Sequence, residues 1–388
     1  MKYDFDEIVD RRGSGCYNYD SEHARGLLPL WVADMDFRAA PCIQEALRKR
    51  LEHGVFGYTC VQDSYYEAVG RWFAKHHGWE GLSRENLLYT IGVVPAISAV
   101  LQALCKEGDG VVLLSPSYNC FYSSIRNSRC RALECDLVKR NRHFEIDWDD
   151  LEEKMRQARV FLLCNPHNPT GRFWTREEML RMAKIADENG VFVISDEIHC
   201  EFAFAGNQYV PYATVATNKQ YCVCMSPSKA FNIAGLQMAN IYSPDSDILR
   251  RVDKQINVVE ICDVNPFGPV ATEAVYSDEG WDWLQQLMQY IEGNYRYLQQ
   301  RIADEMPMLE VTEMEGTYLA WVDCRALLNE QIPDSAALEQ AIAETTGVLF
   351  NGGLMYGQAG HDYLRINMAC PRATLAKALG KLKEFSND

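Results

Sequence analysis

The sequence predicts an α/β protein with a mainly parallel central sheet that has helices on both faces, together with a smaller α+β domain. Two observations predict the sheet. Short apolar runs such as Val160–Cys164 and Val191–Ser195 each end in a polar cluster, and such runs are typical of strands buried on both faces. Amphipathic segments such as Arg176–Asn189 lie between them, as the crossovers between parallel strands require.

Length and charge bound the class of protein. A chain of 388 residues is long enough for a large buried core and predicts two or three domains. The hydrophobic share of 47% and the charged share of 24% are typical of a globular protein. The formal net charge of −16 argues against nucleic acid or an anionic membrane as the main partner, because both would repel the average field of the protein.

The N-terminal residues and the cysteines indicate a compartment. Met1–Glu7 carries charges where a signal peptide would need an apolar core, and no later apolar run approaches the length of a membrane span. Most of the fourteen cysteines lie inside apolar runs, and none has the C-x-x-C spacing of a zinc site. We therefore expect a cytoplasmic protein with reduced thiols and no metal.

The segment up to about Asp36 has little helical or strand periodicity and is dense in polar, glycine and aromatic residues. Segments of this length without regular structure usually have a function or wrap over a partner. A mobile N-terminal arm explains the same composition. The sequence leaves both interpretations open.

Two helices follow this segment. We expect the first over Pro41–Arg50, because proline fits the first helical turn. After a loop at Phe56–Thr59, an amphipathic helix is expected over Ser64–His76. It closes on two histidines before Gly78, where cations suit a helix C-terminus, so the pair predicts no metal site.

Strands and helices alternate from Leu87 onward. The expected strands are Leu87–Tyr89, Val111–Leu114, Val160–Cys164, Val191–Ser195 and Tyr221–Met225. Helices over Pro95–Cys105 and Arg176–Asn189 separate some of them. Ligands bind beyond the carboxyl ends of the strands in such sheets, and polar residues gather at those ends here.

The chain closes with a more helical region and a compact α+β pattern. A long amphipathic helix is expected from Trp281 to about Met306, and strands follow at Tyr318–Val322 and Tyr363–Asn367. The predicted segments are an N-terminal arm with part of the small domain, a large ligand-binding domain and a small C-terminal domain, at residues 1–50, 51–285 and 286–388.

One lysine stands directly after an apolar run. The run Tyr221–Met225 is followed by Ser226-Pro227-Ser228-Lys229. A buried lysine shifts its pKa readily and becomes a nucleophile, so Lys229 could bind the aldehyde of a cofactor covalently. Alone, a lysine at such a position is more often a solvated surface residue.

Residues of complementary chemistry gather at the predicted strand ends. They are Gly92, Val93, Val94, Tyr118, Asn168, Asp196, His199, Ser226, Ser228 and Lys229. Together they are the residue types needed to hold pyridoxal phosphate. A phosphate could lie against Gly92–Val94, where a helix N-terminus offers backbone N–H groups, with hydroxyl donors from Ser226 and Ser228.

The ring of that cofactor needs further partners. Asp196 facing the pyridine nitrogen would keep it protonated, which lets the ring take up electrons from the substrate. Asn168 could donate to the phenolic oxygen, and Tyr118 could stack on the ring. Each has a plainer interpretation, as a helix cap, a turn residue or a core aromatic, and His199 alone would be structural. Their joint position at five strand ends favours the cofactor site.

Three motifs resemble a known family. Asn-Pro-His-Asn-Pro-Thr-Gly at residues 165–171, Asp-Glu-Ile-His at 196–199 and Ser-Pro-Ser-Lys at 226–229 resemble the signatures of fold-type I pyridoxal-phosphate enzymes, the aspartate aminotransferase superfamily. The match follows the order of the chain along nearly its whole length. The resemblance implies the fold-type I architecture, with a large domain that binds the cofactor.

Four further stretches are similar to the MalY/PatB branch of that superfamily, which comprises cystathionine β-lyases and related lyases of cysteine S-conjugates. They lie at residues 11–15, 31–37, 228–237 and 365–372. Many aminotransferases have a phosphate-binding arginine in a Gly-x-Arg pattern after the lysine. This chain has Gly235-Leu236-Gln237 instead, a replacement that the branch commonly shares.

The resemblance implies a role for each matching residue. Lys229 would hold the cofactor and act as the base, and Arg365 would bind the substrate carboxylate through its guanidinium. Tyr58 would reach the phosphate of the neighbouring subunit, which requires a homodimer with shared sites, and Tyr58 or Tyr118 could assist catalysis. The implied cofactor residues are Tyr58, Gly92, Val93, Val94, Tyr118, Asn168, Asp196, His199, Ser226, Ser228 and Lys229. The implied substrate residues are Trp31, Ala33, Asn168 and Arg365.

The activity implied by the resemblance is α,β-elimination from a cysteine-type amino acid, which gives a thiol, pyruvate and ammonia. A place in methionine biosynthesis would suit it. An aminotransferase of class I/II uses the same residues up to removal of the α-proton, and the motifs do not separate the two. A family member with an added role in binding a transcription regulator is a further alternative. The sequence leaves the preferred thiol open.

Overall fold

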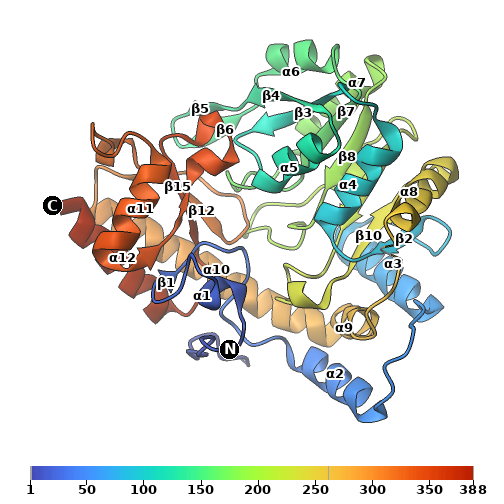
Figure 1. The fold of residues 1–388 in the computed structure, drawn as a ribbon, viewed down its shortest axis with the longest axis horizontal. Helices are drawn as coiled ribbons and strands as arrows, with labels where there is room; N and C mark the ends of the chain where they lie inside the picture. The colour runs from blue at the N-terminus through green and yellow to red at the C-terminus, as the bar shows by residue number, and fades with distance from the viewer. Residues whose placement is uncertain (1, 261, 388) are drawn as a thin grey trace.

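A seven-stranded sheet forms the centre of the protein in the computed structural model, which describes residues 2–260 and 262–387 (Figure 1). The strands lie in the order β2-β10-β9-β8-β7-β3-β4. Their bounds are β2 Leu87–Thr90, β3 Gly110–Ser115, β4 Arg131–Asp136, β7 Val160–Cys164, β8 Phe192–Asp196, β9 Tyr221–Met225 and β10 Ala239–Tyr242. The five strands expected from the sequence are all present.

Neighbouring strands of this sheet are parallel except around β10, which pairs antiparallel with both β9 and β2. The predicted mainly parallel sheet is therefore confirmed, and β10 and β4 are additions to it. Strand β4 lies at the edge of the sheet and carries exposed charged residues, so it has no continuous apolar run that would reveal it. Strand β10 follows β9 after residues 226–238, which contain Lys229 and are here called the lysine turn.

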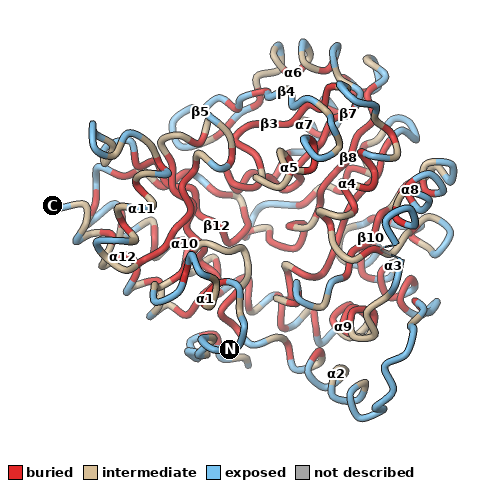
Figure 2. Tube along the Cα trace, in the orientation of Figure 1, coloured by how far each residue is buried: buried red, intermediate tan, exposed pale blue. Residues whose placement is uncertain are grey.

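The apolar runs supply both faces of the sheet. In β7, Val160 and Leu162 point into one apolar cluster, whereas Phe161 and Leu163 point into the other, as the two-residue period of a strand requires. Helices α4, α5 and α8 cover the first cluster, and α3, α6 and α7 contribute to the second. Figure 2 shows the resulting buried strands between exposed helical surfaces.

The helices match the expected ones closely. Their bounds are α1 Tyr17–Asp20, α2 Pro41–His53, α3 Asp63–His77, α4 Val93–Leu104, α5 Asn119–Asn127, α6 Trp148–Met155, α7 Arg176–Glu188, α8 Ser246–Val258, α9 Gly268–Val275, α10 Asp278–Glu305, α11 Ser335–Thr346 and α12 Arg372–Asn387. Short 3-10 turns lie at Tyr212–Thr214, Ala234–Leu236, Arg325–Leu327, Gly353–Tyr356 and Gln358–Gly360. None of these helices is long and apolar enough to cross a membrane.

Glycines at the ends of two helices explain why the sequence predicted these helices nearly at their observed bounds. Helix α3 stops at Gly78, whose φ of 61° is left-handed and suits glycine. Helix α4 begins at Val93, two residues before the predicted proline, because Gly92 is its N-cap. The start of α4 therefore brings Gly92 and the first helical N–H groups to the end of the sheet.

A smaller α+β part contains the chain that follows α10. Its sheet has the order β11-β12-β15-β14 and is antiparallel. The small strands are β1 Leu28–Pro29, β5 Val138–Arg140, β6 His143–Glu145, β11 Glu310–Val311, β12 Leu319–Asp323, β13 Val348–Leu349, β14 Asn351–Gly352 and β15 Tyr363–Asn367. Helix α10 runs along the base of the molecule between the large and the small part (Figure 1). The domain boundaries given above stay predictions.

The N-terminal segment is packed rather than free. Strand β1 pairs with β13 of the C-terminal part, and Phe5, Leu30 and Met35 are buried in the main apolar cluster. The segment is therefore packed against the body of the protein, which argues against a mobile arm, and the predicted wrapping over a partner stays a prediction.

A buried arginine links the two sheets close to their junction. Arg172 follows β7 and is 2% exposed. Its Nη2 atom donates to both carboxylate oxygens of Glu178 at 2.9 Å, and its Nε atom donates to Glu315 at 3.0 Å. Glu315 precedes β12, so one guanidinium holds the large sheet, α7 and the small sheet together. Removing one partner of a buried ion pair leaves the opposite charge buried without a counter-charge, which destabilises the folded protein.

We expect Arg172→Met to lower the free energy of unfolding by about 3 kcal/mol, because Glu178 and Glu315 lose their shared cation while the side-chain volume is nearly kept. Urea denaturation followed by circular dichroism measures this change. The control is Arg140→Met, since Arg140 pairs with Glu145 at the surface and should change little. Equal stabilities of the two variants would contradict the assignment.

Candidate active site

Most of the residues predicted for the cofactor, though not Tyr58 or Ser226, meet in one pocket at the carboxyl ends of the central strands. Register explains the meeting: Cys164 of β7 lies beside Asp196 of β8, which lies beside Cys224 of β9. The segments that follow these strands therefore leave the sheet side by side. The pocket has a volume of about 190 Å³ and is lined by Ala33, Gly92, Val93, Val94, Pro95, Tyr118, Cys164, Asn168, Asp196, Ile198, His199, Ser228, Lys229 and Ala234.

Lys229 is a buried lysine and not a surface one. Its Nζ atom donates to the carbonyl oxygen of Ala33 at 2.6 Å. Burial, followed by the nearby positive charge of Arg365, lowers the pKa of Lys229 to about 8. With this pKa, about a tenth of the amine is neutral at pH 7, far more than for an ordinary lysine, and the neutral form is the one that a nucleophile or a base requires.

Asp196 is the last residue of β8 and faces the same pocket. Its Oδ1 atom accepts a hydrogen bond from the backbone N–H of Ile198 at 3.1 Å. Burial raises the pKa of Asp196 to about 7, because an ionised carboxylate without a cation is costly in a low-dielectric site. A cation placed against this carboxylate would restore its ionised form.

The neighbouring Glu197 points into the protein and anchors the end of β8. Its carboxylate accepts hydrogen bonds from the hydroxyls of Ser195 and Tyr209, from the side-chain amide of Asn165 and from the backbone N–H of Tyr212. Burial raises the pKa of Glu197 to about 7. These contacts fix the backbone that presents Asp196.

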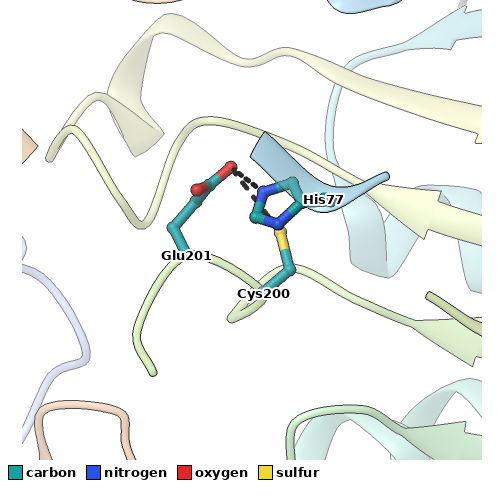
Figure 3. A group of neighbouring side chains, drawn as sticks. All are labelled: His77, Cys200 and Glu201. Atoms are coloured by element: carbon teal, nitrogen blue, oxygen red, sulfur yellow. Dashed lines mark hydrogen bonds and ion pairs between the residues drawn. The ribbon is translucent and has the colours of Figure 1, made fainter. Parts of the chain in front are cut away.

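A second polar cluster follows on the same segment (Figure 3). Glu201 accepts hydrogen bonds from Trp72 Nε1 at 2.6 Å and from His77 Nε2 at 3.1 Å, and Cys200 lies beside them. Burial keeps the pKa of the Cys200 thiol well above its ordinary value. The sequence predicted no metal at the histidine pair; the contacts observed for His77 tie the end of α3 to the segment after β8.

Asn168 lines the pocket, and Arg365 contacts Asn168 from the small sheet. Arg365 lies on β15 and is 4% exposed. Its Nη1 atom donates to Asn168 Oδ1 at 3.3 Å and its Nη2 atom donates to the carbonyl oxygen of Trp31 at 2.8 Å. Within the described residues, its buried Nε atom has no hydrogen-bond partner. The guanidinium thus keeps a donor available for an anionic ligand.

The segment Trp31–Phe37, here called the strap, crosses between the two sheets beside Lys229. Asn367, two residues after Arg365, donates to the carbonyl oxygens of Val32 and Asp34 at 2.6 Å each. Asn232, three residues after Lys229, donates to Met35 and Phe37 and accepts from the Met35 N–H. Sequence reasoning gave neither asparagine a role, although both lie in stretches that resemble the MalY/PatB branch, because they bind backbone groups.

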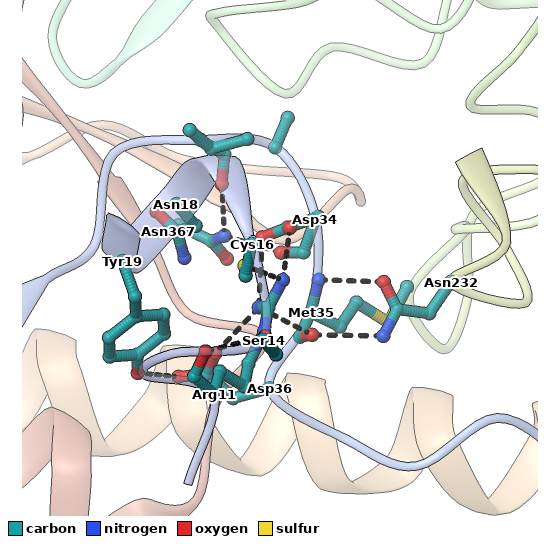
Figure 4. A network of polar contacts seen from close by, with 12 residues as sticks. Arg11, Ser14, Cys16, Asn18, Tyr19, Asp34, Met35, Asp36, Asn232 and Asn367 are labelled. Carbon is teal, nitrogen blue, oxygen red and sulfur yellow. Dashed lines mark hydrogen bonds and ion pairs between the residues drawn. The ribbon is translucent and has the colours of Figure 1, made fainter. Parts of the chain in front are cut away.

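An ion-pair network holds the outer side of the strap (Figure 4). Arg11 donates to the carboxylates of Asp34 and Asp36 and to the carbonyl oxygen of Met35. Tyr19 donates to the other oxygen of Asp36 at 2.8 Å. The strap is therefore fixed by side chains on both of its edges.

Only some of the residues predicted to bind the cofactor phosphate have groups available in the pocket. Gly92 and the first residues of α4 line the pocket, as does Ser228. The hydroxyl of Ser226 donates to the carbonyl oxygen of Met238 and accepts from the Ser228 N–H. It is engaged in holding the lysine turn, so its predicted contact with the cofactor stays a prediction.

His199 and Tyr118 form other walls of the pocket. His199 is buried, and within the described part of the chain its Nδ1 atom has no hydrogen-bond partner. Burial lowers the pKa of His199 to about 3, so the ring is neutral. Burial raises the pKa of Tyr118 well above its ordinary value, so the phenol keeps its proton. Both rings offer uncharged surfaces to a planar ligand.

Two predicted residues do not reach the pocket with their side chains. Tyr58 is 97% exposed on the loop after α2. The indole of Trp31 packs against the rings of Tyr17 and His23. The backbone carbonyl of Trp31, and not its indole, contacts Arg365. The roles given to Tyr58 and Trp31 stay predictions.

Comparison with known proteins places this pocket in a family. The family model for aminotransferase class I and II matches residues 25–382, which include every residue of the pocket. The chain belongs to this family.

Members of the family resemble the chain along its whole length. Cystathionine beta-lyase PatB of Bacillus subtilis (strain 168) is 36% identical over 387 residues, with 98% of each chain covered. The crystal structure of a PLP-bound putative aminotransferase from Clostridium difficile 630 has a TM-score of 0.95 at 38% identity and covers 99% of this chain and 100% of that one. The PLP-bound C-S lyase from Staphylococcus hominis has a TM-score of 0.93 at 34% identity and covers 100% and 99%. The predicted superfamily, fold type and MalY/PatB branch are confirmed.

We expect Asn232→Gly to loosen the strap. Glycine tolerates the φ of 55° at this position, so the substitution removes the three hydrogen bonds without backbone strain. Amide exchange at Met35 should accelerate at least about tenfold, because its acceptor is lost. Hydrogen exchange with mass spectrometry measures this. The matched control is Asn141→Gly, an exposed asparagine with a φ of 57°; equal exchange in both variants would contradict the role of Asn232.

Proposed function

We propose that the chain is a pyridoxal-phosphate-dependent carbon–sulfur β-lyase that acts on cysteine-type amino acids. The observation that carries the proposal is the buried Lys229 amine, with its pKa lowered to about 8, in one pocket with Asp196 and with Asn168, which Arg365 contacts. Similarity to PatB and to the Staphylococcus hominis C-S lyase over nearly the full chain supports it.

The residues of the pocket fit pyridoxal phosphate. Asp196 is a buried acid with no ion-pair partner among the described residues, and a protonated pyridine nitrogen would supply one. The start of α4 at Gly92 offers backbone N–H groups to the phosphate, and Ser228 adds a donor. Asn168 would contact the phenolic oxygen, Tyr118 would stack on the ring, and Lys229 would bind the aldehyde. When bound, the cofactor takes up the electrons released at the substrate α-carbon.

The chain's own residues then position the substrate and move one proton. Arg365 binds the α-carboxylate through its guanidinium. Lys229 removes the α-proton, and the Ala33 carbonyl oxygen, which accepts an N–H of the same amine, orients it. Cleavage of the bond between the β-carbon and sulfur releases a thiolate. With one water consumed, the cysteine conjugate becomes a thiol, pyruvate and ammonium, with no net oxidation or reduction.

Transamination is the second candidate. It is favoured by the similarity to the putative aminotransferase from Clostridium difficile 630, which is as close as the lyases in identity and coverage. An aminotransferase would use Lys229, Asp196 and Arg365 in the same way up to removal of the α-proton. The two activities differ in whether a 2-oxo acid is required.

We further propose that the chain acts as a homodimer with shared sites. Helix α2 and the loop after it project from the body of the protein, as Figure 2 shows, and expose Leu51, Val55, Phe56 and Tyr58. A cavity of about 720 Å³ with a mainly apolar wall adjoins α2 near Cys42 and Val270. Exposed apolar surface of this kind is typical of a protein interface. A second copy of the chain would cover it and bring Tyr58 to the neighbouring phosphate.

We expect Lys229→Ala to abolish both the visible absorbance of a cofactor bound to lysine and the formation of pyruvate, because no other amine lines the described pocket. Absorbance spectra and a pyruvate assay measure the two losses. The control is Lys219→Ala at the exposed turn before β9, which should keep both. Retention of absorbance and activity in Lys229→Ala would exclude this lysine.

A substrate assay separates the two activities. The proposed lyase forms pyruvate and a free thiol from cystathionine without any added 2-oxo acid. Thiol titration and coupled pyruvate detection follow the products. Strict dependence on 2-oxoglutarate would instead assign the chain as an aminotransferase.

Mixing two inactive variants tests the shared sites. A hybrid of Lys229→Ala and Tyr58→Ala chains has one intact site, because the lysine and the tyrosine of that site come from different chains. After chain exchange, random pairing should restore about a quarter of the wild-type activity. Unchanged, near-zero activity in a mixture that native mass spectrometry shows to contain hybrids would exclude the contribution of Tyr58 to the neighbouring site.

A further inference from the structure

The end of helix α3 meets the segment after β8 in a cluster of three side chains that metals bind (Figure 3). A ring nitrogen of His77, the sulfur of Cys200 and a carboxylate oxygen of Glu201 all lie within 4.8 Å of one another. None of the three residues lines the pocket of the proposed active site. The cluster is therefore a separate feature of the protein.

An ion pair between His77 and Glu201 accounts for only part of this cluster. The Oε1 atom of Glu201 accepts a hydrogen bond from Trp72 and contacts His77. The Oε2 atom of the same carboxylate is buried, and it has no hydrogen-bond partner among the residues that the structure describes. Since buried polar atoms are nearly always paired, an oxygen of this kind points to a bound water or ion.

The distances in the cluster suit a small tetrahedral cation. Zinc, with bonds of about 2.0–2.3 Å, holds its ligand atoms about 3.3–3.8 Å apart. Glu201 Oε1 lies 3.1 Å from His77 Nε2 and 3.9 Å from Cys200 Sγ. The free Oε2 atom or a water would complete the four-coordinate shell. The side chain of His77 is 9% exposed, whereas that of Glu201 is 3% exposed, so a metal would enter from the side of His77.

Charge and ligand type favour zinc over other cations. A thiolate and a carboxylate carry two negative charges, which balance Zn²⁺ beside a neutral imidazole, so the buried centre has no net charge. The proton of the Cys200 thiol leaves to solvent as the bond between sulfur and zinc forms. Mg²⁺ and Ca²⁺ prefer shells made of oxygen atoms alone, and a shell with sulfur and nitrogen disfavours them.

We propose that His77, Cys200 and Glu201 form a zinc site. The bound zinc joins the end of α3 to residues 196–201, the segment from which Asp196 and His199 line the pocket. The site does not depend on the proposed lyase activity. The sequence predicted no metal at the histidine pair, because His77 and Glu201 are 124 residues apart and no local motif brings them together.

A zinc titration of the purified holoenzyme tests the site. Metals are first removed with a chelator under reducing conditions, and Zn²⁺ is then added in competition with a chromophoric chelator. We expect one equivalent per chain, with a dissociation constant that rises at least about tenfold in Cys200→Ser and in His77→Gln. Each variant removes one ligand, and even the outer partners of a zinc site are worth about ten- to a hundredfold in affinity.

Two matched controls share the chemistry of these variants. His76→Gln changes the adjacent histidine, which stacks on Trp281 with 3.8 Å between ring centroids and is not part of the cluster. Cys262→Ser removes an exposed thiol. Both controls should keep the wild-type affinity for zinc.

Cobalt gives a spectroscopic signature that a merely structural ion pair would not. Co²⁺ added to the metal-free wild-type holoenzyme should give the strong visible d–d bands of a tetrahedral site and a charge-transfer band from a thiolate. Cys200→Ser should lose the charge-transfer band. Zinc should also raise the Tm of the wild-type protein but not that of Cys200→Ser, because only the folded wild-type chain offers the complete site.

The wild-type measurements decide the question even if a variant fails to fold. A metal-free holoenzyme that takes up no equivalent of zinc would overturn the proposal. Weak octahedral cobalt bands without a thiolate band would overturn it as well. Zinc affinities that are equal in Cys200→Ser and Cys262→Ser would assign the metal to other groups and would also refute the site.

Discussion

The hydrogen bond from the Lys229 amine to the Ala33 carbonyl oxygen is the contact on which the arrangement of the site depends. It joins the large sheet to the strap, and Tyr318 of the small part donates to the same oxygen at 2.9 Å. Asn367 and Asn232 hold the strap from the two sheets. The proposed base and the proposed carboxylate ligand are thus positioned against the same stretch of backbone.

Desolvation sets the chemistry of the groups that surround this contact. It lowers the pKa of Lys229 and of His199 and raises that of Asp196. Each shift favours the uncharged form, as burial does for any ionisable group. These shifts reduce the charge that the pocket carries, although Lys229 stays mostly protonated at pH 7. Pyridoxal phosphate brings both a cation and anions. Asp196 would bind its protonated nitrogen, and the N–H groups at the start of α4 would bind its phosphate.

The sequence predicted what apolar runs and side-chain types can encode. Strand β9 was predicted at its observed bounds, and Asp196 ends and Lys229 follows strands that are buried on both faces. Strand β4 escaped prediction because its exposed charges interrupt the apolar pattern. The contacts of Asn232 and Asn367 with the strap escaped for another reason: they use backbone groups, which every residue has, so residue types do not reveal them.

The hydroxyl of Ser226 gives the lysine turn a property of its own. By donating to the carbonyl oxygen of Met238, it joins the end of β9 to the start of β10, two antiparallel neighbours in the sheet. The segment between them is therefore a loop whose two ends are joined by this hydrogen bond. The number of residues between Ser226 and Met238 fixes its length. An inserted or deleted residue there would shift the amine along the pocket while leaving the strand pairing intact.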